Sequence, residues 1–388
     1  MVSSVPLAQP WNGADKNFAN LLVRRDRYNR FIVHTNLKEP WDPPPRVTAI
    51  RSRRASAMPT MEQRLREIGY MLRHSGSADL IHLVASLYGP SPLTGPALRA
   101  WATVRRRPIV HTLPSVGDVP IERRNFAGDA TVVVSEHTRR RLKDHGVPNV
   151  YRVYPPLEIE SPGPVRPAAL QKTIGELKLG DRAILYPAHY GEKSGIREMI
   201  HAFSRLRGSS ESERAVLVLA CRSHSWQDPE AEKQKVLKQA AEVGISGRVR
   251  VLGYVADMPA LISACAVTVL VPGRLSGKMD LPLVILESLA LGRPVIVADQ
   301  APISEALLGE GGYAVPYGDV PALASSLARL LGNVGLREKL AERGRASVLE
   351  HCNPEKIVEH YQWIYERVAK SDSRQGYQVR SENRSGAL

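Results

Sequence analysis

The stretch that decides the fold is Gly277-Lys-Met-Asp-Leu-Pro-Leu-Val-Ile-Leu-Glu-Ser-Leu-Ala-Leu-Gly-Arg-Pro-Val-Ile-Val-Ala-Asp299. It predicts a loop, a short helix over residues 281–291, a turn and a buried strand. Asp280 is a favourable N-cap, and Pro282 suits the first turn, where no N–H is needed. Gly292 suits the left-handed position that follows a helix. The alternation predicted here is that of an α/β sheet.

The predicted helix is apolar on nearly every side, which indicates a buried helix, yet it carries Glu287. A carboxylate in such a place needs a partner, so Glu287 either pairs with an internal cation or faces a ligand. Arg274 and Lys278 precede the helix, and a helix N-terminus beside cations attracts phosphate through N–H groups such as those of Leu281 and Leu283. A carboxylate for sugar hydroxyls two turns from a diphosphate site suits a nucleotide-sugar binder.

Length and composition set the class of protein. A chain of 388 residues predicts two domains of roughly 150–200 residues. No apolar run approaches the roughly 20 residues of a membrane span, and residues 1–10 lack the basic start and apolar core of a secretory signal. Cys221, Cys265 and Cys352 lie far apart, which predicts reduced, mostly buried thiols in a cytoplasmic protein.

The formal charge of +14 is uneven, because residues 1–160 hold 24 Lys and Arg against 14 Asp and Glu. Arginines cluster at 24–25, 51–54, 105–107 and 139–141. One interpretation is an ordinary solvated surface. The other is attraction to an anionic partner: a membrane, a lipid-phosphate acceptor or an acidic glycan. No nucleic-acid partner is expected, because the sequence has no helix-turn-helix, zinc-finger or aromatic RNA-binding signature.

The C-terminal half alternates short apolar runs with amphipathic ones. Strands are predicted at 183–187, 215–220, 249–252, 267–271 and from 295, with helices at 196–206, 229–243 and 258–265. Continuous apolar strands between amphipathic helices predict a parallel sheet covered on both faces. Ligands of such sheets bind beyond the carboxyl ends of the strands.

The N-terminal half repeats this pattern less clearly. Strands are predicted at 2–5, 30–33, 80–84, 108–112 and 130–134, a helix at 138–145, and a long loop at 35–57. A helical stretch from Leu336 to about Lys370 is broken near Asn353 and Pro354. The predicted organisation is an N-terminal domain (1–160), a proline-rich linker (161–170), a second domain (171–352), a C-terminal helix (353–372) and a disordered tail (373–388). The expected fold is α/β, with two doubly wound Rossmann-like domains facing a cleft.

Four segments resemble the GT-B glycosyltransferases, specifically the retaining family 4 among the group 1 glycosyl transferases. They are Asp257-Met-Pro-Ala-Leu-Ile-Ser-Ala-Cys-Ala-Val-Thr-Val-Leu-Val271; Asp280-Leu-Pro-Leu-Val-Ile-Leu-Glu287 with Ala290-Leu-Gly-Arg-Pro-Val295; Gly312-Tyr-Ala-Val-Pro-Tyr-Gly-Asp319; and Gly128-Asp-Ala-Thr-Val-Val-Val-Ser-Glu-His-Thr-Arg139. The resemblance spans about residues 80–350 and is more specific in the C-terminal half.

The resemblance implies a nucleotide-diphosphate sugar donor held by the C-terminal domain and a hydroxyl acceptor (glycan, lipid-linked or small molecule) held mainly by the N-terminal domain. It implies transfer with retention at the anomeric carbon, and a C-terminal helix that crosses back to the first domain. No cofactor and no metal are expected, and the sequence contains no Asp-x-Asp. Two alternatives stay open: a non-catalytic nucleotide-sugar-binding or scaffold protein, and a nucleotide-sugar epimerase.

For the donor site, the resemblance assigns the ribose hydroxyls to Glu287 and the diphosphate to Lys193, which directly follows the first strand of the second domain. Arg222 or Arg274 would supply a second cation. Tyr254 and Val255 resemble the segment that cradles the nucleobase, with an ordinary strand-end aromatic as the alternative.

Two positions depart from the family. Met279 stands where the family often has a glutamate that contacts the donor sugar, and Asp280 either replaces it or caps the helix. His189 stands near the place of the usual arginine. In the N-terminal domain, Gly13 is expected near the diphosphate and Asp15 near the acceptor.

Two more residues of the N-terminal domain are acceptor or sugar candidates. His111 lies in a predicted strand, and we favour a core histidine over a contact with the sugar. Ser115, at the end of that strand, is a candidate acceptor contact.

Overall fold

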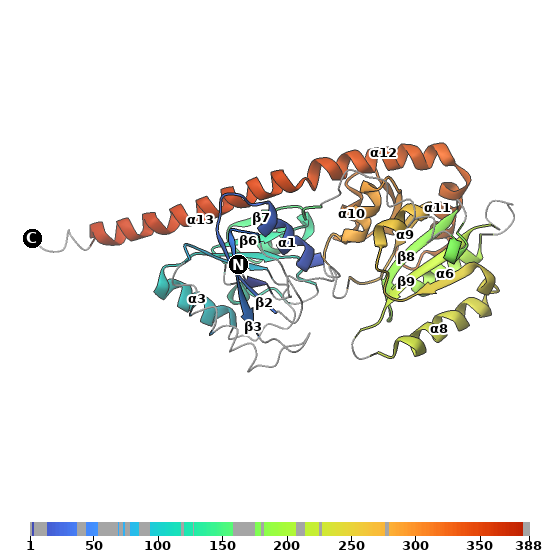
Figure 1. The fold of residues 1–388 in the computed structure, drawn as a ribbon, viewed down its shortest axis with the longest axis horizontal. Coiled ribbons are helices and arrows are strands. Elements are labelled where there is room, and N and C mark those ends of the chain that lie inside the picture. The colour runs from blue at the N-terminus through green and yellow to red at the C-terminus, as the bar shows by residue number, and fades with distance from the viewer. Residues whose placement is uncertain are drawn as a thin grey trace, which may run out of the picture. The chain divides into compact units, whose positions relative to one another are not determined.

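The structure is a computed structural model of the whole chain, shown in Figure 1. It describes residues 2–3, 14–36, 44–52, 69, 73, 78–84, 94–117, 120–126, 128–157, 175–179, 182–206, 214–224, 227–275 and 279–382. The chain divides into two compact units. Unit 1 comprises Met1–Glu158, Gly277–Asp280 and Cys352–Leu388, and unit 2 comprises Ile159–Ser276 and Leu281–His351.

In unit 1 the described strands form a parallel seven-stranded sheet in the order β3-β2-β1-β4-β5-β6-β7. Their bounds are β1 Val2–Ser3, β2 Phe31–Asn36, β3 Val47–Ser52, β4 Ile81–Val84, β5 Ile109–Leu113, β6 Ala130–Val133 and β7 Val150–Arg152. The described side chains of β5 and β6 are all buried, as expected for central strands of a sheet covered on both faces.

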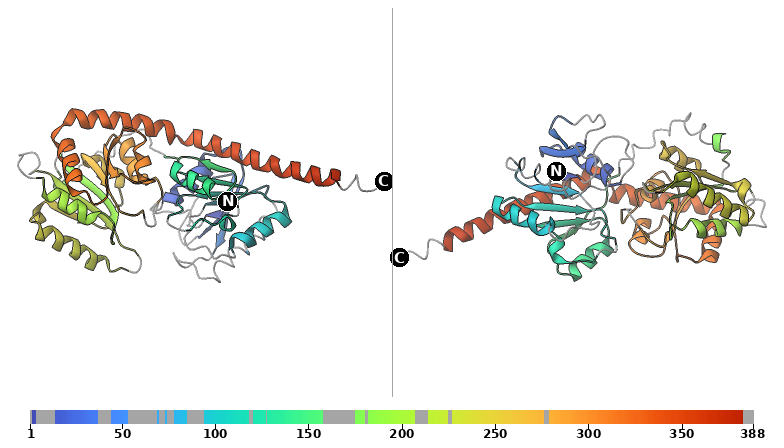
Figure 2. Two further views of the ribbon diagram at one scale, coloured as in Figure 1. Left: turned by 180° about the vertical axis from the view of Figure 1, so that it is seen from behind. Right: turned by 90° about the horizontal axis from the view of Figure 1, so that it is seen from below.

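The helices of unit 1 cover both faces of this sheet. They are α1 Ala14–Arg25, α3 Thr94–Arg105, α4 Glu136–Asp144 and α13 Pro354–Glu382, with a 3₁₀ turn at Arg123–Asn125. The C-terminal helix α13 packs against α1 and β5, whereas α4 packs against β6 and β7. The right panel of Figure 2 shows α4 on the opposite side of the sheet from α1.

In unit 2 the described strands form a parallel six-stranded sheet in the order β10-β9-β8-β11-β12-β13. Their bounds are β8 Ala183–His189, β9 Val216–Arg222, β10 Val249–Leu252, β11 Val267–Leu270, β12 Val295–Ala298 and β13 Gly312–Val315. Each strand leads into a helix or 3₁₀ turn. From β8 the sheet grows in one direction through β9 and β10 and then in the other through β11, β12 and β13. The edge between β8 and β11 is therefore the switch point of a doubly wound sheet.

The helices of unit 2 are α6 Ile196–Ser204, α8 Pro229–Glu242, α9 Met258–Ala264, α10 Leu283–Ala290, α11 Val320–Gly332 and α12 Val334–His351, with 3₁₀ turns at Ser246–Arg248 and Ile303–Leu307. Three of them, α8, α9 and α11, begin after an aspartate whose side chain accepts a backbone N–H, with proline in the first turn. The sequence thus specifies these starts locally. Helices α9 and α10 pack on β8, β11 and β12.

Most elements predicted for the C-terminal half are confirmed within one or two residues, including the left-handed Gly292 (φ 69°) and the break between α12 and α13. All three cysteines are free and buried, as predicted. In the part of the chain that the structure describes, no helix combines the length and apolarity required to cross a bilayer.

Four predictions about local structure are wrong. The predicted loop 35–57 contains the end of β2 and the whole of β3, because residues Val47–Ser52 pair in parallel with β2. Elements α1, α3, β7 and β13 were not predicted. Residues 373–382, predicted to be disordered, continue α13, since extending an existing helix avoids the cost of nucleation.

The fourth error concerns the start of α10. The helix begins at Leu283, and Pro282 rather than Asp280 occupies its N-cap position.

The predicted linker 161–170 lies outside the described residues.

Candidate functional site

Three of the predicted donor residues of unit 2, and His189, an acceptor or sugar candidate, lie at or just after the carboxyl ends of its strands. His189 ends β8 and Arg222 ends β9, and the two are register partners in the sheet. Tyr254 follows β10, and Arg274 follows β11. Because the carboxyl ends of parallel strands share one edge, the structure brings these side chains to the same edge of the sheet.

Lys193 lies in the loop between β8 and α6 and is held in the left-handed conformation (φ 58°) with an exposed side chain. Its carbonyl accepts the backbone N–H of Gly273 at 2.8 Å. Gly273 directly precedes Arg274, so this hydrogen bond ties together the two loops that carry the predicted diphosphate cations. An exposed lysine in a fixed loop suits binding of an anion, whereas a buried one would need an internal partner.

The Lys193 loop ends at Gly195, which precedes α6 with φ 80°. A Cβ atom there would overlap the Tyr186 hydroxyl and the Val271 carbonyl. The Tyr186 hydroxyl donates to the carbonyl of Ser194 at 2.8 Å from within the sheet. Glycine is therefore required at this position, and the loop conformation is fixed by the core beneath it.

Glu287 lies in the middle of α10, where its side chain is partly buried. Its carboxylate has no ion pair or side-chain hydrogen bond with any residue that the structure describes. Burial raises the pKa of this carboxyl to about 7. Among the described residues no cation pairs with Glu287, so the alternative of an internal ion pair is not observed there. Glu287 is a partly buried acid without a partner in the described part of the chain.

The amino end of α10 follows the fully buried Leu281 and begins at Leu283. The first N–H groups of a helix have no acceptor within it, so the N–H of Leu283 is oriented toward the space before the helix. Lys278, predicted to flank this end, lies outside the described residues.

Asp280 does not cap α10 as one of its two predictions had it, and the other, a contact with the donor sugar, stays a prediction. Its side chain is only 2% exposed, and Oδ2 accepts hydrogen bonds from the hydroxyls of Ser135 (2.6 Å) and Thr138 (2.5 Å). Both partners belong to unit 1, as does Asp280 itself. Sequence reasoning missed Ser135 and Thr138, although Ser135 carries the signal of an N-cap and is the N-cap of α4.

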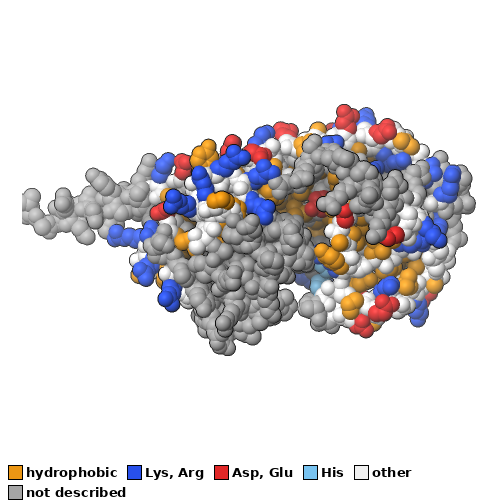
Figure 3. Space-filling view, viewed as in Figure 1, with side chains coloured by type: hydrophobic (Ala, Val, Ile, Leu, Met, Phe, Trp, Pro, Cys, Tyr) orange, Lys and Arg blue, Asp and Glu red, His pale blue; other side chains and the backbone are white. Residues whose placement is uncertain are grey.

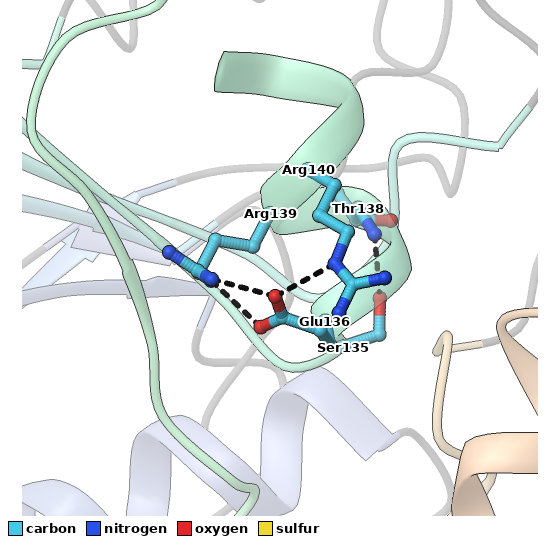
Figure 4. Close-up of polar contacts among 5 residues, drawn as sticks. All are labelled: Ser135, Glu136, Thr138, Arg139 and Arg140. Carbon is cyan, nitrogen blue, oxygen red and sulfur yellow. Dashed lines mark hydrogen bonds and ion pairs between the residues drawn. The ribbon is translucent and has the colours of Figure 1, made fainter. Parts of the chain in front are cut away.

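Figure 4 shows the start of α4. The Oγ atom of Ser135 accepts the N–H of Thr138 at 3.1 Å, and Glu136 accepts hydrogen bonds from Arg139 and Arg140. Hydrogen bonding from Arg139 is the main cause that lowers the pKa of Glu136 to about 2. Two arginines of the 139–141 cluster are thus engaged within the helix.

The other candidates of unit 1 have mixed outcomes. His111 is buried within β5, as expected of a core histidine, and Ser115 is buried with its Oγ accepting the N–H of Gly117. Asp15 lies in the first turn of α1. Gly13 lies outside the described residues. Their contacts with an acceptor stay predictions.

Two features near the sheet edge of unit 2 were not predicted. His189 stacks on His224, with ring centroids 5.1 Å apart. Tyr317, after β13, packs closely on Gly273: a Cβ atom added to Gly273 would lie 2.6 Å from the Tyr317 ring. No sequence pattern marks His224, and Tyr317 lies in the family-like segment 312–319 without a role predicted for it.

Of the two residues predicted to cradle the nucleobase, Tyr254 is 61% exposed, and Val255 packs against the core cluster formed by β8, β9 and α9.

The comparisons with known proteins agree with this geometry. Residues 181–333 match the family profile described as Glycosyl transferases group 1. A lipopolysaccharide core biosynthesis glycosyltransferase of Rhizobium meliloti is 29% identical over 46% of this chain and 48% of its own length. An N-acetyl-alpha-D-glucosaminyl L-malate synthase of Bacillus anthracis is 26% identical over 52% of this chain and 50% of its own. The chain thus spans about half the length of these curated relatives in the alignments.

Among solved structures, that of HepE from Anabaena in complex with UDP and glucose is similar over 94% of this chain and 99% of its own, with a TM-score of 0.71 and 14% identity. At that identity the likeness establishes the fold. The chain therefore has the two-domain GT-B fold, and its residues 181–333 are similar to the group 1 glycosyl transferases.

Proposed function

We propose that this chain is a glycosyltransferase that moves a sugar from a nucleotide-diphosphate sugar to a hydroxyl group of an acceptor. The observation that carries the proposal is Glu287, an acid without a partner among the described residues, on the helix that follows the β11 loop. A carboxylate accepts two hydrogen bonds from a vicinal diol, so Glu287 suits the ribose of a nucleotide. The group 1 match over residues 181–333 and the UDP bound by HepE support the same class of donor.

In the proposed reaction, the bond between the anomeric carbon and the diphosphate oxygen breaks. Lys193, Arg274 and the first N–H groups of α10 stabilise the negative charge of the departing diphosphate. The acceptor hydroxyl attacks the anomeric carbon from the face that the diphosphate leaves, and this same-face attack gives retention. The proton of the hydroxyl passes to the departing phosphate. Because cations and a helix N-terminus meet this charge, we propose that the reaction proceeds without a metal ion.

The remaining donor residues have roles at the edge of the sheet. Arg222 and His189 would contact the diphosphate or sugar, and Tyr254 with Val255 would line the nucleobase. Acceptor binding belongs to unit 1, with Gly13, Asp15, His111 and Ser115 as candidates. The acceptor class is a glycan, a lipid-linked sugar or a small molecule.

A thermal-shift screen with nucleoside diphosphates and their sugars tests the donor site. A ligand at 100 times its Kd stabilises the native state by about 2.7 kcal/mol. We expect Glu287→Ala to abolish the shift that UDP or another diphosphate produces. Glu338→Ala, which removes an exposed carboxylate of α12, is the matched control and should keep it. An unchanged shift in Glu287→Ala would remove Glu287 from the donor site.

Turnover separates the enzyme from the alternative of a non-catalytic nucleotide-sugar-binding protein. That alternative is favoured by Met279, a buried apolar residue at the position of the first family glutamate. Donor hydrolysis or transfer by the full chain would support the enzyme, and tight binding without either would support the binding protein. The anomeric configuration of the product tests retention, and unchanged turnover in EDTA tests metal independence.

We also propose a cytoplasmic location with peripheral contact to an anionic membrane through unit 1. Arg24, Arg27 and Arg30 are exposed around Tyr28, whose side chain is 82% exposed, at the end of α1. Basic side chains appear in blue on the viewed surface of unit 1 in Figure 3. Co-sedimentation with vesicles that contain phosphatidylglycerol, but not with pure phosphatidylcholine vesicles, is the expected result.

A further inference from the structure

Asp280, which precedes α10, makes hydrogen bonds through both its backbone and its side chain. The N–H of Asp280 donates to the carbonyl of Pro114 at 3.0 Å, directly after β5. Its carboxylate accepts the hydroxyls of Ser135 and Thr138 at the amino end of α4, directly after β6. Backbone and side chain therefore bind the carboxyl ends of two adjacent strands of unit 1.

This arrangement is unlike an ordinary structural aspartate. Asp257 and Asp319 are exposed caps, and each accepts a backbone N–H of the helix that it begins. Asp280 instead is buried, caps no helix of its own, and has no cationic partner among the described residues. Burying a carboxylate is costly, and two short hydroxyl hydrogen bonds beside the positive end of α4 offset that cost.

We propose that Asp280 is a positioning residue that anchors to unit 1 the chain entering α10, rather than a contact of the donor sugar. Three residues after this anchor, α10 begins with the N–H groups that we assign to the diphosphate. Fixing one end of this short connection limits the orientations of those groups. The effect on turnover rests on the proposed function, whereas the anchor itself is a property of the fold.

Hydrogen exchange of the full chain tests the anchor without any substrate. Thr138→Val keeps the shape of the side chain but removes one of the two hydroxyl donors. We expect the amides of residues 279–286 to exchange about tenfold faster or more. A tenfold ratio of exchange rates corresponds to about 1.4 kcal/mol, which is near the lower end of the contribution of a hydrogen bond to a charged group. Unchanged exchange in this segment would overturn the proposal.

Two variants control this measurement. Thr131→Val removes a buried hydroxyl on β6 that has no hydrogen-bond partner among the described residues, so it should leave exchange of 279–286 unchanged. Thr138→Ser keeps the hydroxyl and should behave as the unmodified chain. Faster exchange of 279–286 in either variant would show general loosening of unit 1 and would overturn the anchor.

Kinetics distinguish an anchor from a sugar contact. As an anchor, Asp280→Asn and Thr138→Val each lower kcat about tenfold, leave the affinity for UDP unchanged, and are non-additive when combined. If Asp280 binds the donor sugar, Asp280→Asn alone raises KM for the nucleotide sugar and Thr138→Val resembles the unmodified chain, which would overturn the proposal. If no donor is turned over, the proposed function fails while hydrogen exchange still decides the anchor.

Discussion

The Nδ1 atom of His82 lies 2.7 Å from the hydroxyl oxygen of Tyr365, so a hydrogen bond joins β4 to α13 across 283 residues of sequence. The Nε2 atom of His82 contacts the Thr112 hydroxyl at 2.8 Å, and Thr112 also contacts the hydroxyl of Tyr361 at 2.9 Å. These four side chains are buried and hydrogen-bonded to one another. The polar network therefore specifies where the C-terminal helix docks on the sheet of unit 1.

Tyr365→Phe should weaken this docking. The variant removes one hydroxyl and leaves a buried ring nitrogen of His82 unpaired, at a cost of about 1–3 kcal/mol. We expect faster hydrogen exchange in α13 peptides and an earlier urea transition of unit 1. Tyr28→Phe, which changes a tyrosine that is 82% exposed, should leave both measurements unchanged. Equal behaviour of the two variants would show that the network contributes little.

Glu287→Gln should stabilise unit 2 at high pH. Burial raises the pKa of this carboxyl from 4.5 to about 7. Between these values the native protein holds a proton that the unfolded chain has released, so stability falls as pH rises through this window. Above pH 7 the ionised group costs up to about 3 kcal/mol. The neutral amide avoids this cost but still loses nucleotide binding.

Hydrogen exchange of β11 and β12 measures the effect at each pH. We expect the gain of Glu287→Gln over the unmodified chain to be small at pH 5 and to reach about 1–3 kcal/mol at pH 8. Glu338→Gln should show no such difference. A gain that is the same at both values would mean that the ionised carboxylate is well solvated.

Lys193→Gln should lower turnover more than it lowers binding. The exposed ammonium group is proposed to stabilise charge that develops on the departing diphosphate, and removal of one such donor typically costs about 10²–10³ in kcat. UDP affinity should fall far less. Lys238→Gln, on the exposed face of α8 in the same unit, is the matched control. A loss of UDP affinity with kcat unchanged would instead assign Lys193 to ground-state binding.

Gly344→Ala should destabilise the packing of α12 on α10. A Cβ at Gly344 would lie 2.7 Å from Leu289 and 2.8 Å from the Cα atom of Gly311, closer than real Cβ contacts. Overpacking of this kind costs about 1–3 kcal/mol, measured as a lower thermal midpoint. Gly335→Ala, earlier in α12, meets only Asn333 at 3.8 Å and should be neutral or slightly stabilising. A reversed order of the two variants would contradict the packing argument.

The sequence predicts unit 2 well because its signals are local. The apolar runs that become β8, β9, β11 and β12 are mostly or fully buried strands. Asp228, Asp257 and Asp319 with their following prolines specify helix starts. Unit 1 is less predictable: β3 and β7 are edge strands, each paired on one side only, so they lack the continuous apolar run of a central strand. Glu287 was identified because a carboxylate stands out in an apolar helix, whereas Lys193 was identified through the resemblance to a family that carries a lysine in this loop.

The sequence by itself determined the α/β class and five strands of the second sheet, because hydrophobic periodicity and capping act over a few residues. The candidate donor residues came mainly from the resemblance to a known family. Only the tertiary structure decided which side chains Asp280 contacts. A local rule made it a helix cap, but its hydroxyl partners lie more than 140 residues earlier in the chain. The same holds for His82 and Tyr365: contacts between distant residues follow from how elements pack, and no local pattern encodes them.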